Sequence, residues 1–201
     1  MAGKYLWLFD NGHGGIIDGV YQTPGKRSPV WPDGTQLFEG EFNRAIVKRL
    51  MTLCDQEGID YMNIVPEETD ISRAERISRA NEVYQQNKKC IYLSIHANAG
   101  GGRGWEVYTS FGETKSDKIA TVFFEMVKKE FGQITMRSDY SDGDPDKEKP
   151  QFDVLVQTHM PAILTENFFM DNFDECKNFL MSESGRDSIA NAHFKAIMKI
   201  T

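Results

Sequence analysis

The fold is decided near the beginning of the chain by the stretch Tyr5-Leu6-Trp7-Leu8-Phe9-Asp10-Asn11-Gly12-His13-Gly14-Gly15. Residues 5–9 are apolar and predict a buried strand, which ends at the glycine-rich turn of residues 11–15. In open α/β sheets, ligands bind beyond the carboxyl ends of the strands, and glycine lets the backbone approach an ion closely. His13 is therefore a candidate ligand, although an ordinary loop histidine explains the turn alone equally well.

Strands alternate with helices along the rest of the chain. Short apolar runs predict strands, and apolar residues at helical spacing predict helices, the first of which begins at Glu39 and ends before Gly58. We expect strands at 5–9, 60–65, 90–95, 104–108 and 161–166, and helices at 39–57, 71–87, 116–131, 173–181 and 186–200. This alternation predicts an α/β fold, a single three-layer domain whose mostly parallel sheet of about five to six strands is flanked by helices.

The length of the chain is sufficient for one full core. With 201 residues we expect one domain, residues 1–201. Residues 16–38 show no clear period and predict a long functional loop. Residues 137–150 are rich in Asp, Lys, Gly and Pro and predict an exposed loop rather than a linker, since fewer than about 60 residues remain for a second core.

The composition excludes several classes of function. The formal net charge is -7, from 30 acidic and 23 basic residues, and the basic residues form no block typical of a nucleic-acid-binding arm. The three cysteines are far apart and predict neither a disulfide framework nor a thiolate zinc site. The apolar run before Asp10 is too short for a signal peptide or a membrane span. We expect a protein made in the cytoplasm without a signal peptide, with no membrane segment and no nucleic-acid partner.

A second histidine follows another predicted strand. His96 lies in Ser94-Ile95-His96-Ala97-Asn98-Ala99, at the end of the strand at 90–95. His96 alone could be a hydrogen-bonded core histidine, but two histidines at two strand ends favour a metal pair. Two histidines and a carboxylate supply three protein ligands to Zn²⁺ and leave a fourth position for water, which is typical of a zinc hydrolase.

Two glutamates are candidates for the remaining roles. Glu39 lies in the first turn of the first helix, where the helix dipole favours any acidic residue, and Glu41 is a nearby alternative. Glu166 lies inside an apolar stretch at 162–169, a setting that charges avoid unless they are paired or coordinated. Burial would raise the pKa of Glu166 towards neutrality, as a general base and acid at physiological pH requires.

A serine nucleophile is the competing chemistry. Ser94 and His96 are two residues apart on a strand and point to the same face, but no G-x-S-x-G elbow presents the hydroxyl. Two further histidines remain. His159 precedes the last strand and is a candidate for lining the site, whereas His193 lies in the last helix, where we expect a solvated face.

These motifs carry a resemblance to a known family. The chain resembles, over nearly its whole length, the zinc-dependent N-acetylmuramoyl-L-alanine amidases of bacterial autolysins and phage endolysins. The motifs that carry the resemblance are, in order, residues 11–15, Glu39 with the helix behind it, and residues 76–81, 94–99, 104–108 and 160–169.

The resemblance implies a set of roles. It favours Glu39 over Glu41 and implies that His13, Glu39 and His96 bind Zn²⁺ and that Glu166 is the catalytic residue. The implied reaction is hydrolysis of the amide that joins N-acetylmuramic acid to L-alanine of the peptidoglycan stem peptide.

Three features depart from the family pattern. The loop at 16–38 is long for the family, and its residues Tyr21, Arg27 and Trp31 are expected to form one wall of the peptidoglycan groove. The segment between His96 and Glu166 is too short for the inhibitory helix of some cell-division members, which predicts constitutive activity. Asn11 stands where proline is common, a change expected to alter only the stiffness of the turn.

Three residues are candidates for contacting the substrate: Asn98, Trp31 and His159.

The resemblance also implies a partner and a place of action. Peptidoglycan is the expected partner, and the cell wall is the expected place of action, reached in the manner of a phage endolysin through a holin-type membrane lesion. A recycling amidase is the rival role. There are two alternative functions. One is another zinc amidase or peptidase that acts on cell-wall peptides, and the other is a catalytically silent peptidoglycan-binding protein. The sequence predicts neither the oligomeric state nor a preference for zinc over other divalent ions.

Overall fold

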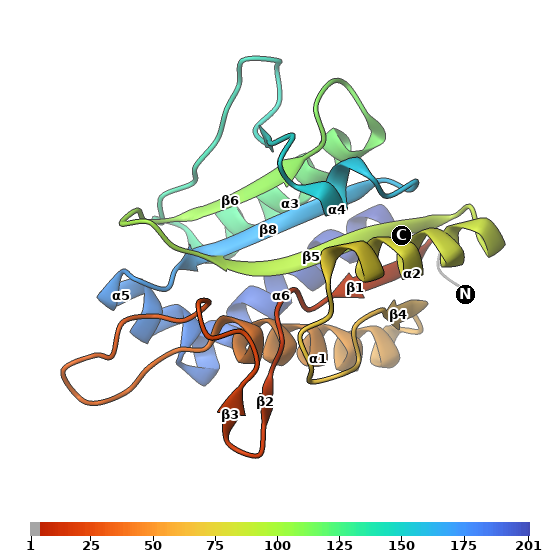
Figure 1. Cartoon of the computed structure of the whole chain (residues 1–201). Coiled ribbons are helices and arrows are strands. Elements are labelled where there is room, and N and C mark those ends of the chain that lie inside the picture. The colour runs from red at the N-terminus through yellow and green to blue at the C-terminus, as the bar shows by residue number, and fades with distance from the viewer. Residues whose placement is uncertain (1–4) are drawn as a thin grey trace.

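Six strands form one central sheet with helices on both faces (Figure 1). The computed structural model describes residues 5–201. The strand order is β4-β1-β5-β8-β6-β7, and every neighbouring pair is parallel except β6 and β8. The strands are β1 (Leu6–Asp10), β4 (Tyr61–Asn63), β5 (Cys90–Asn98), β6 (Trp105–Thr109), β7 (Lys147–Glu148) and β8 (Ala162–Phe169). The predicted single α/β domain with a mostly parallel sheet is confirmed.

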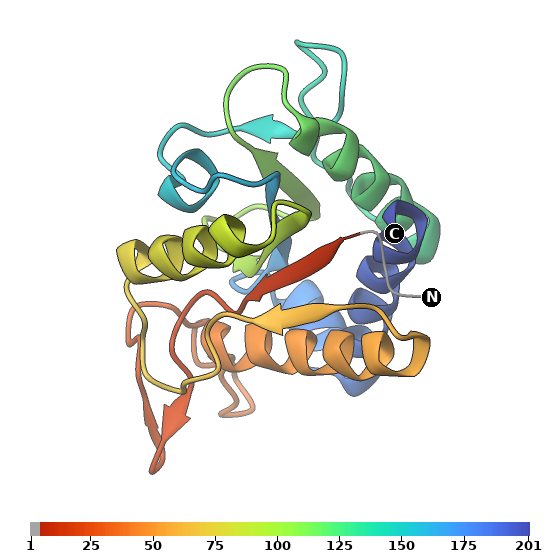
Figure 2. The same ribbon diagram turned by 90° about the vertical axis from the view of Figure 1, so that its right-hand side faces the viewer.

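The helices form the two outer layers, as the side view in Figure 2 shows. One face of the sheet packs against α1 (Glu39–Glu57), α3 (Lys115–Phe131) and α6 (Glu183–Ile200), and the other against α2 (Arg73–Gln86) and the short α4 (Asp153–Val156). Gly58 ends α1 in the left-handed conformation with φ 67°, as predicted. The single helix predicted at 173–181 is instead divided into α5 (Phe173–Glu175) and a π-helical turn (Cys176–Leu180).

Alternation along the strands assigns each side chain to one layer. Trp7 and Phe9 lie in the core shared with α1, α3 and α6, whereas Leu8 between them lies in the core shared with α2. On β5 and β8, Tyr92 and Leu164 also belong to the α2 side. Because successive side chains point to opposite faces, Ser94, His96 and Glu166 face the α2 side as well. The alternation breaks further along β8, where Phe168 adopts φ 61° and packs in the other core.

The two segments predicted as loops contain short strands. Residues 16–38 include a hairpin of β2 (Ile16–Ile17) and β3 (Val20–Tyr21), which projects away from the sheet in Figure 1. The segment at 137–150 was predicted to be exposed, and this prediction is wrong in part: β7 pairs with β6, and Asp146 is buried with its carboxylate bonded to the Thr109 hydroxyl.

The structure also bears on membrane association. No helix within residues 5–201 combines the length and the apolar character needed to cross a membrane. Residues 1–4, on which the signal-peptide prediction partly rests, lie outside the described residues.

Candidate active site

The turn after β1 places His13 against His96. Gly12 adopts φ +69°, and a Cβ atom at this position would lie 2.5 Å from Cε1 of His96, so that only glycine fits between the turn and the ring. The Gly12 N–H donates to the Asp10 carboxylate at 2.9 Å, which fixes the turn to the end of the strand. The guanidinium of Arg44, on α1, donates to the carbonyl oxygen of His13. The sequence reasoning assigned no role to Arg44.

The loop at 16–38 fixes the first turn of α1, where Glu39 lies. The Tyr21 hydroxyl accepts a hydrogen bond from the Gly40 N–H and donates one to the Lys26 carbonyl, at 2.9 and 2.8 Å. The Glu39 N–H donates to the same Lys26 carbonyl at 3.0 Å. The Glu39 carboxylate is 2% exposed and is directed inwards at the base of the cavity described below.

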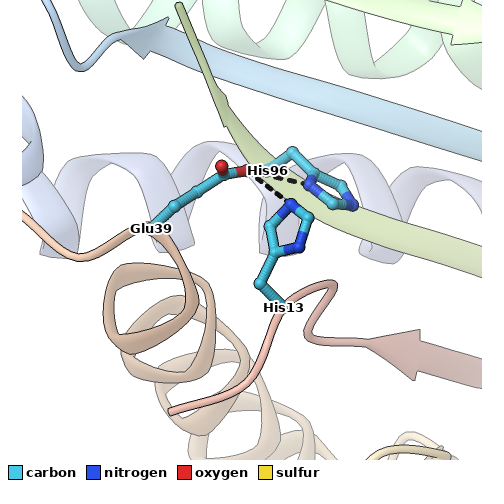
Figure 3. A group of neighbouring side chains, drawn as sticks. All are labelled: His13, Glu39 and His96. Carbon is cyan, nitrogen blue, oxygen red and sulfur yellow. Dashed lines mark hydrogen bonds and ion pairs between the residues drawn. The ribbon is translucent and has the colours of Figure 1, made fainter. Parts of the chain in front are cut away.

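The three predicted ligands meet, as Figure 3 shows. Oε1 of Glu39 lies 2.9 Å from Nδ1 of His96 and 3.5 Å from Nε2 of His13. One ligand atom from each residue falls within 4.8 Å of the others, and this is the one such cluster of His, Cys, Asp or Glu found within residues 5–201. The rings of His13 and His96 lie nearly perpendicular, with centroids 5.1 Å apart.

The donor set of this cluster fits a divalent metal ion. Oε2 of Glu39 is buried and has no hydrogen-bond partner among the described residues, so a cation would satisfy an otherwise unpaired oxygen. Burial alone would raise the pKa of Glu39, but the hydrogen bonds and charges of His13 and His96 lower it below its usual value. Burial also lowers the pKa of His13. A carboxylate that stays ionised and a histidine that stays neutral are the protonation states that metal binding requires.

Glu166 lies beside the cluster on the neighbouring strand. It is the register partner of His96 across β5 and β8, so the two side chains lie on the same face of the sheet. Burial raises the pKa of Glu166 well above its usual value, and the charges of Glu39 and Glu106 raise it further. Its Oε2 atom is buried and unpaired among the described residues. Its raised pKa and its position beside the cluster make Glu166 the candidate for proton transfer.

The Ser94 hydroxyl is engaged in a buried hydrogen-bond network. It donates to Oδ2 of Asp10 at 2.8 Å, and that fully buried carboxylate also receives hydrogen bonds from Tyr92 and Arg76, at 2.6 and 3.0 Å. Burial opposes ionisation of Asp10, but Arg76 and the hydrogen bonds nevertheless lower its pKa. Ser94 thus belongs to a buried network beneath the site, and this arrangement does not support a serine nucleophile.

A cavity of about 370 Å³ opens over the cluster and Glu166. Asn98 lies on its wall, as expected for a candidate substrate contact, and so do Lys26 from the long loop and Arg73 from α2. The sequence reasoning missed these last two, because a lone cation in a loop or at a helix start carries no signal of its own.

Other predicted residues lie elsewhere. Glu41, the alternative ligand, forms a bidentate ion pair with Arg186. Trp31 does not line this cavity but packs edge-on against Phe173 at 5.2 Å, so Lys26 is the residue of the loop that reaches the cavity. His159 was expected to line the site; the structure corrects this, because the residue precedes β8 at the opposite end from Glu166 and its ring packs near Tyr84.

The prediction for His193 is wrong. It was expected on a solvated face of the last helix, but it is fully buried and bonded to the Thr165 hydroxyl at 3.0 Å. The rings of Phe123 and Trp105 surround it. The apolar spacing of α6 did not reveal this, because histidine is polar in sequence, and its two partners, the Ile189 carbonyl of the same helix and the distant Thr165 hydroxyl, become visible only in the folded chain.

Comparisons with known proteins agree with this geometry. The model of the Amidase_3 family, described as N-acetylmuramoyl-L-alanine amidase, matches residues 8–199. The N-acetylmuramoyl-L-alanine amidase CwlM of Bacillus licheniformis is 28% identical over 192 residues, which is 96% of this chain and 67% of that protein. The endolysin of Bacillus phage SPP1 is 28% identical over 205 residues, 98% of this chain and 66% of the endolysin. The chain thus spans about two thirds of the length of these curated relatives.

Solved structures share the fold. Ami1, the N-acetylmuramyl-L-alanine amidase from Mycobacterium smegmatis, superposes with a TM-score of 0.76 at 20% identity, covering 98% of this chain and 96% of that one. The N-acetylmuramoyl-L-alanine amidase from Clostridium difficile 630 gives 0.74 at 23% identity, covering 97% and 95%. Since the family match extends over residues 8–199, nearly the whole chain, this chain belongs to the Amidase_3 family of N-acetylmuramoyl-L-alanine amidases.

Proposed function

We propose that the chain, acting as one catalytic domain over residues 1–201, is a Zn²⁺-dependent N-acetylmuramoyl-L-alanine amidase. In this proposal His13, Glu39 and His96 hold the ion, and Glu166 carries protons. The observation that carries the proposal is the convergence of the three ligand atoms within 4.8 Å, beside Glu166, which is the register partner of His96 and has a raised pKa. Two imidazoles and one carboxylate are a common ligand set for catalytic zinc.

The ion and the chain contribute different parts of the chemistry. Zn²⁺ supplies Lewis-acid polarisation of a carbonyl and makes a water easier to deprotonate at neutral pH. The turn at 11–15, the start of α1 and the end of β5 hold the ligands in place, and Arg44 braces the His13 backbone. None of these elements moves a proton, so that step falls to Glu166.

Glu166 has the properties that the proton transfers require. It accepts the proton of the attacking water and delivers it to the amide nitrogen as the C–N bond breaks, which yields a carboxylic acid on the muramoyl side and a free L-alanine amine. Such general acid–base catalysis contributes about 10²–10⁴-fold in rate. Burial beside Glu39 and Glu106 maintains the raised pKa that lets the group work in both directions.

We further propose that the protein acts on the bacterial cell wall, as a lytic enzyme released through a holin-type membrane lesion. The support is the similarity to the endolysin of Bacillus phage SPP1 and to a Bacillus licheniformis amidase. The cavity wall at Asn98 provides a contact for the substrate in this proposal.

Digestion of purified peptidoglycan tests the proposal. We expect stem peptides with a free L-alanine amino terminus, identified by mass spectrometry, with release lost on chelation and restored by Zn²⁺. Fragments cut within the stem peptide would indicate a peptidase instead. Bound metal with no released product would indicate a silent peptidoglycan-binding protein.

A further inference from the structure

A second pocket adjoins the catalytic cavity. Its volume is about 450 Å³, and Asn98 and Ala99 line both hollows, so the two lie side by side at the end of β5. Its other walls come from β6 and from the segment that carries β7, which contribute Arg137, Lys147 and Lys149. The metal ligands and Glu166 take no part in it.

A buried carboxylate holds this pocket in shape. Glu106, on β6, is 2% exposed and accepts hydrogen bonds from Nε of Arg137 at 2.9 Å and Nζ of Lys147 at 2.6 Å. The amide of Asn98 donates to its other oxygen. Burial alone would raise the pKa of Glu106, but Lys147 and Arg137 lower it. These contacts fix two cations at defined positions beside the catalytic cavity.

The cations keep donors free for a ligand. Arg137 uses Nε for Glu106, and no protein partner of its two terminal nitrogens is found among the described residues, while its guanidinium lies 5.2 Å from the centre of the Phe169 ring. Lys149 lies over the rings of Tyr108 and Phe152, at 4.6 and 5.3 Å. An arginine fork with two terminal nitrogens matches the geometry of a carboxylate.

The two other acidic residues of the pocket wall are engaged by backbone groups. Asp139 accepts the Ser141 N–H, and Glu148 accepts the Gly112 N–H. With Glu106 bound to Arg137 and Lys147, no ion pair of Lys149 with a carboxylate occurs within residues 5–201. Hydrogen bonds from backbone N–H groups leave the charges of Asp139 and Glu148 in place, so the three acidic and three basic side chains of the pocket wall balance. Among the cations, Arg137 and Lys149 keep donors that no carboxylate within residues 5–201 occupies, and these donors are the groups available to a ligand anion.

The strand register gives the spacing from the reacting bond. Glu166 is the register partner of His96 on one side and of Glu106 on the other, so the three lie in a row on one face of the sheet. Neighbouring strands lie about 5 Å apart, which places Glu106 about 10 Å from His96. One residue of an extended chain spans about 3.5 Å, so the pocket lies one to three residues from a bond cleaved at His96 and Glu166.

We propose that this pocket binds the α-carboxylate of the second stem-peptide residue. This inference rests on the proposed function for the position of the scissile bond. In peptidoglycan the residue after L-alanine is D-glutamate joined through its γ-carboxyl, so its α-carboxyl is a free anion or, after amidation, a neutral carboxamide. Arg137 and Lys149 distinguish the two forms, and the enzyme prefers the anion.

A binding measurement tests the proposal directly. Two synthetic peptides, L-alanyl-γ-D-glutamyl-L-lysine amide with a free α-carboxylate or an α-carboxamide on the second residue, are titrated into zinc-loaded enzyme by calorimetry. We expect the carboxylate to bind about 10-fold more tightly, as a charge-assisted hydrogen bond does relative to a neutral one. Equal affinities would overturn the proposal.

Substitutions in the pocket test which residues cause the preference for the α-carboxylate. Arg137→Gln should bring the two affinities within about twofold, and Lys149→Gln, which leaves Glu106 its partners, should reduce the preference about threefold. Lys195→Gln is the matched control, since Lys195 pairs with Glu130 on the opposite side of the sheet and should leave the preference intact. A preference that persists in both Arg137→Gln and Lys149→Gln would assign the anion to another site and overturn the proposal.

Hydrolysis separates the two proposals. Muramoyl tripeptides with the same two second residues are digested in parallel with the titrations. A binding preference without cleavage at L-alanine would leave the pocket in place and refute the amidase assignment. Cleavage of both substrates at equal kcat/KM, with equal binding of the two peptides, would support the amidase and refute the pocket.

Discussion

Two neighbouring residues of β8 each lie beside a different histidine, and the two histidines differ in their surroundings. Thr165 points into the layer of α1, α3 and α6 and bonds to His193, whereas Glu166 points to the opposite face, next to His96. His193 is enclosed by aromatic rings, and His96 opens on a cavity and faces a carboxylate. The comparison shows that residue type does not decide the role of a histidine; the face of the sheet and the partners on that face decide it.

Burial acts on both regions with opposite effects. It lowers the pKa of His193 to about 4, because an imidazolium without a counter-charge is unfavourable in the core. It raises the pKa of Glu166, because a carboxylate there is likewise unfavourable, next to Glu39 and Glu106. The core histidine therefore stays neutral, while the raised pKa of Glu166 agrees with the proton transfer proposed for it.

The largest effect is expected at the proposed metal ligands. Glu39→Gln removes the charge that both histidines face and should abolish metal binding and lower activity by more than about 10⁴-fold, since bound metal contributes several kcal/mol to the transition state. Glu41→Gln is the matched control, because Glu41 pairs with Arg186 outside the cavity and its loss should change activity less than about threefold. Activity that is lost in Glu41→Gln and kept in Glu39→Gln would reverse the ligand assignment.

Glu166→Gln should separate proton transfer from metal binding. We expect kcat to fall about 10²–10⁴-fold with metal content unchanged, because the isosteric amide cannot carry the proton. The melting temperature should stay level or rise, since the substitution removes a carboxylate that lies close to Glu39 and Glu106. Near-normal turnover measured on purified peptidoglycan would refute the role of Glu166.

His193→Ala should lower the stability of the protein and leave metal binding and turnover nearly unchanged. Loss of a fully buried ring and of its bond to Thr165 is expected to lower the free energy of unfolding by about 2–4 kcal/mol, measured by denaturant titration. Metal affinity and kcat should change less than about threefold in the fraction that remains folded. A selective loss of metal would mean that the two faces of β8 are not independent.

The smallest effect concerns pH. Because the pKa of His193 is about 4 in the folded state and near 6.5 in the unfolded chain, the unfolded state binds more protons between these values. Stability should therefore fall by up to about 3 kcal/mol as the pH drops from 6.5 to 4. His193→Phe should remove that part of the slope, and identical pH profiles of the melting temperature in both proteins would contradict the shift.

The sequence predicts the fold well where one local pattern is sufficient. Apolar runs located the main strands, and Gly58 marked the end of α1. The short pieces β2, β3, β7 and α4 were missed, because elements of two to four residues have too little period to recognise. Their positions depend on pairing with distant strands and on packing.

The site was predictable to the extent that its residues lie at strand ends. His13 follows β1, and His96 lies near the end of β5. Neighbouring parallel strands bring such ends together. The supporting groups Arg44 and Glu106 contact residues 31 positions away in the chain, and Lys26 reaches the cavity through the folding of its loop, so no local pattern marks them. His193 was misplaced for a similar reason, since Thr165, its one side-chain partner, is 28 residues away.

Metal content is the most direct test of the central claim, that residues from a turn, a helix start and a strand end form one metal site beside a separate proton carrier. Mass-spectrometric metal analysis of wild-type protein, His96→Ala and Glu166→Gln, each loaded with Zn²⁺ and desalted, would decide it. We expect one ion per chain in the wild type and in the inactive Glu166→Gln protein, and none in His96→Ala. Full metal content in His96→Ala, or its loss in Glu166→Gln, would mean that the ion is held elsewhere or that Glu166 is itself a ligand.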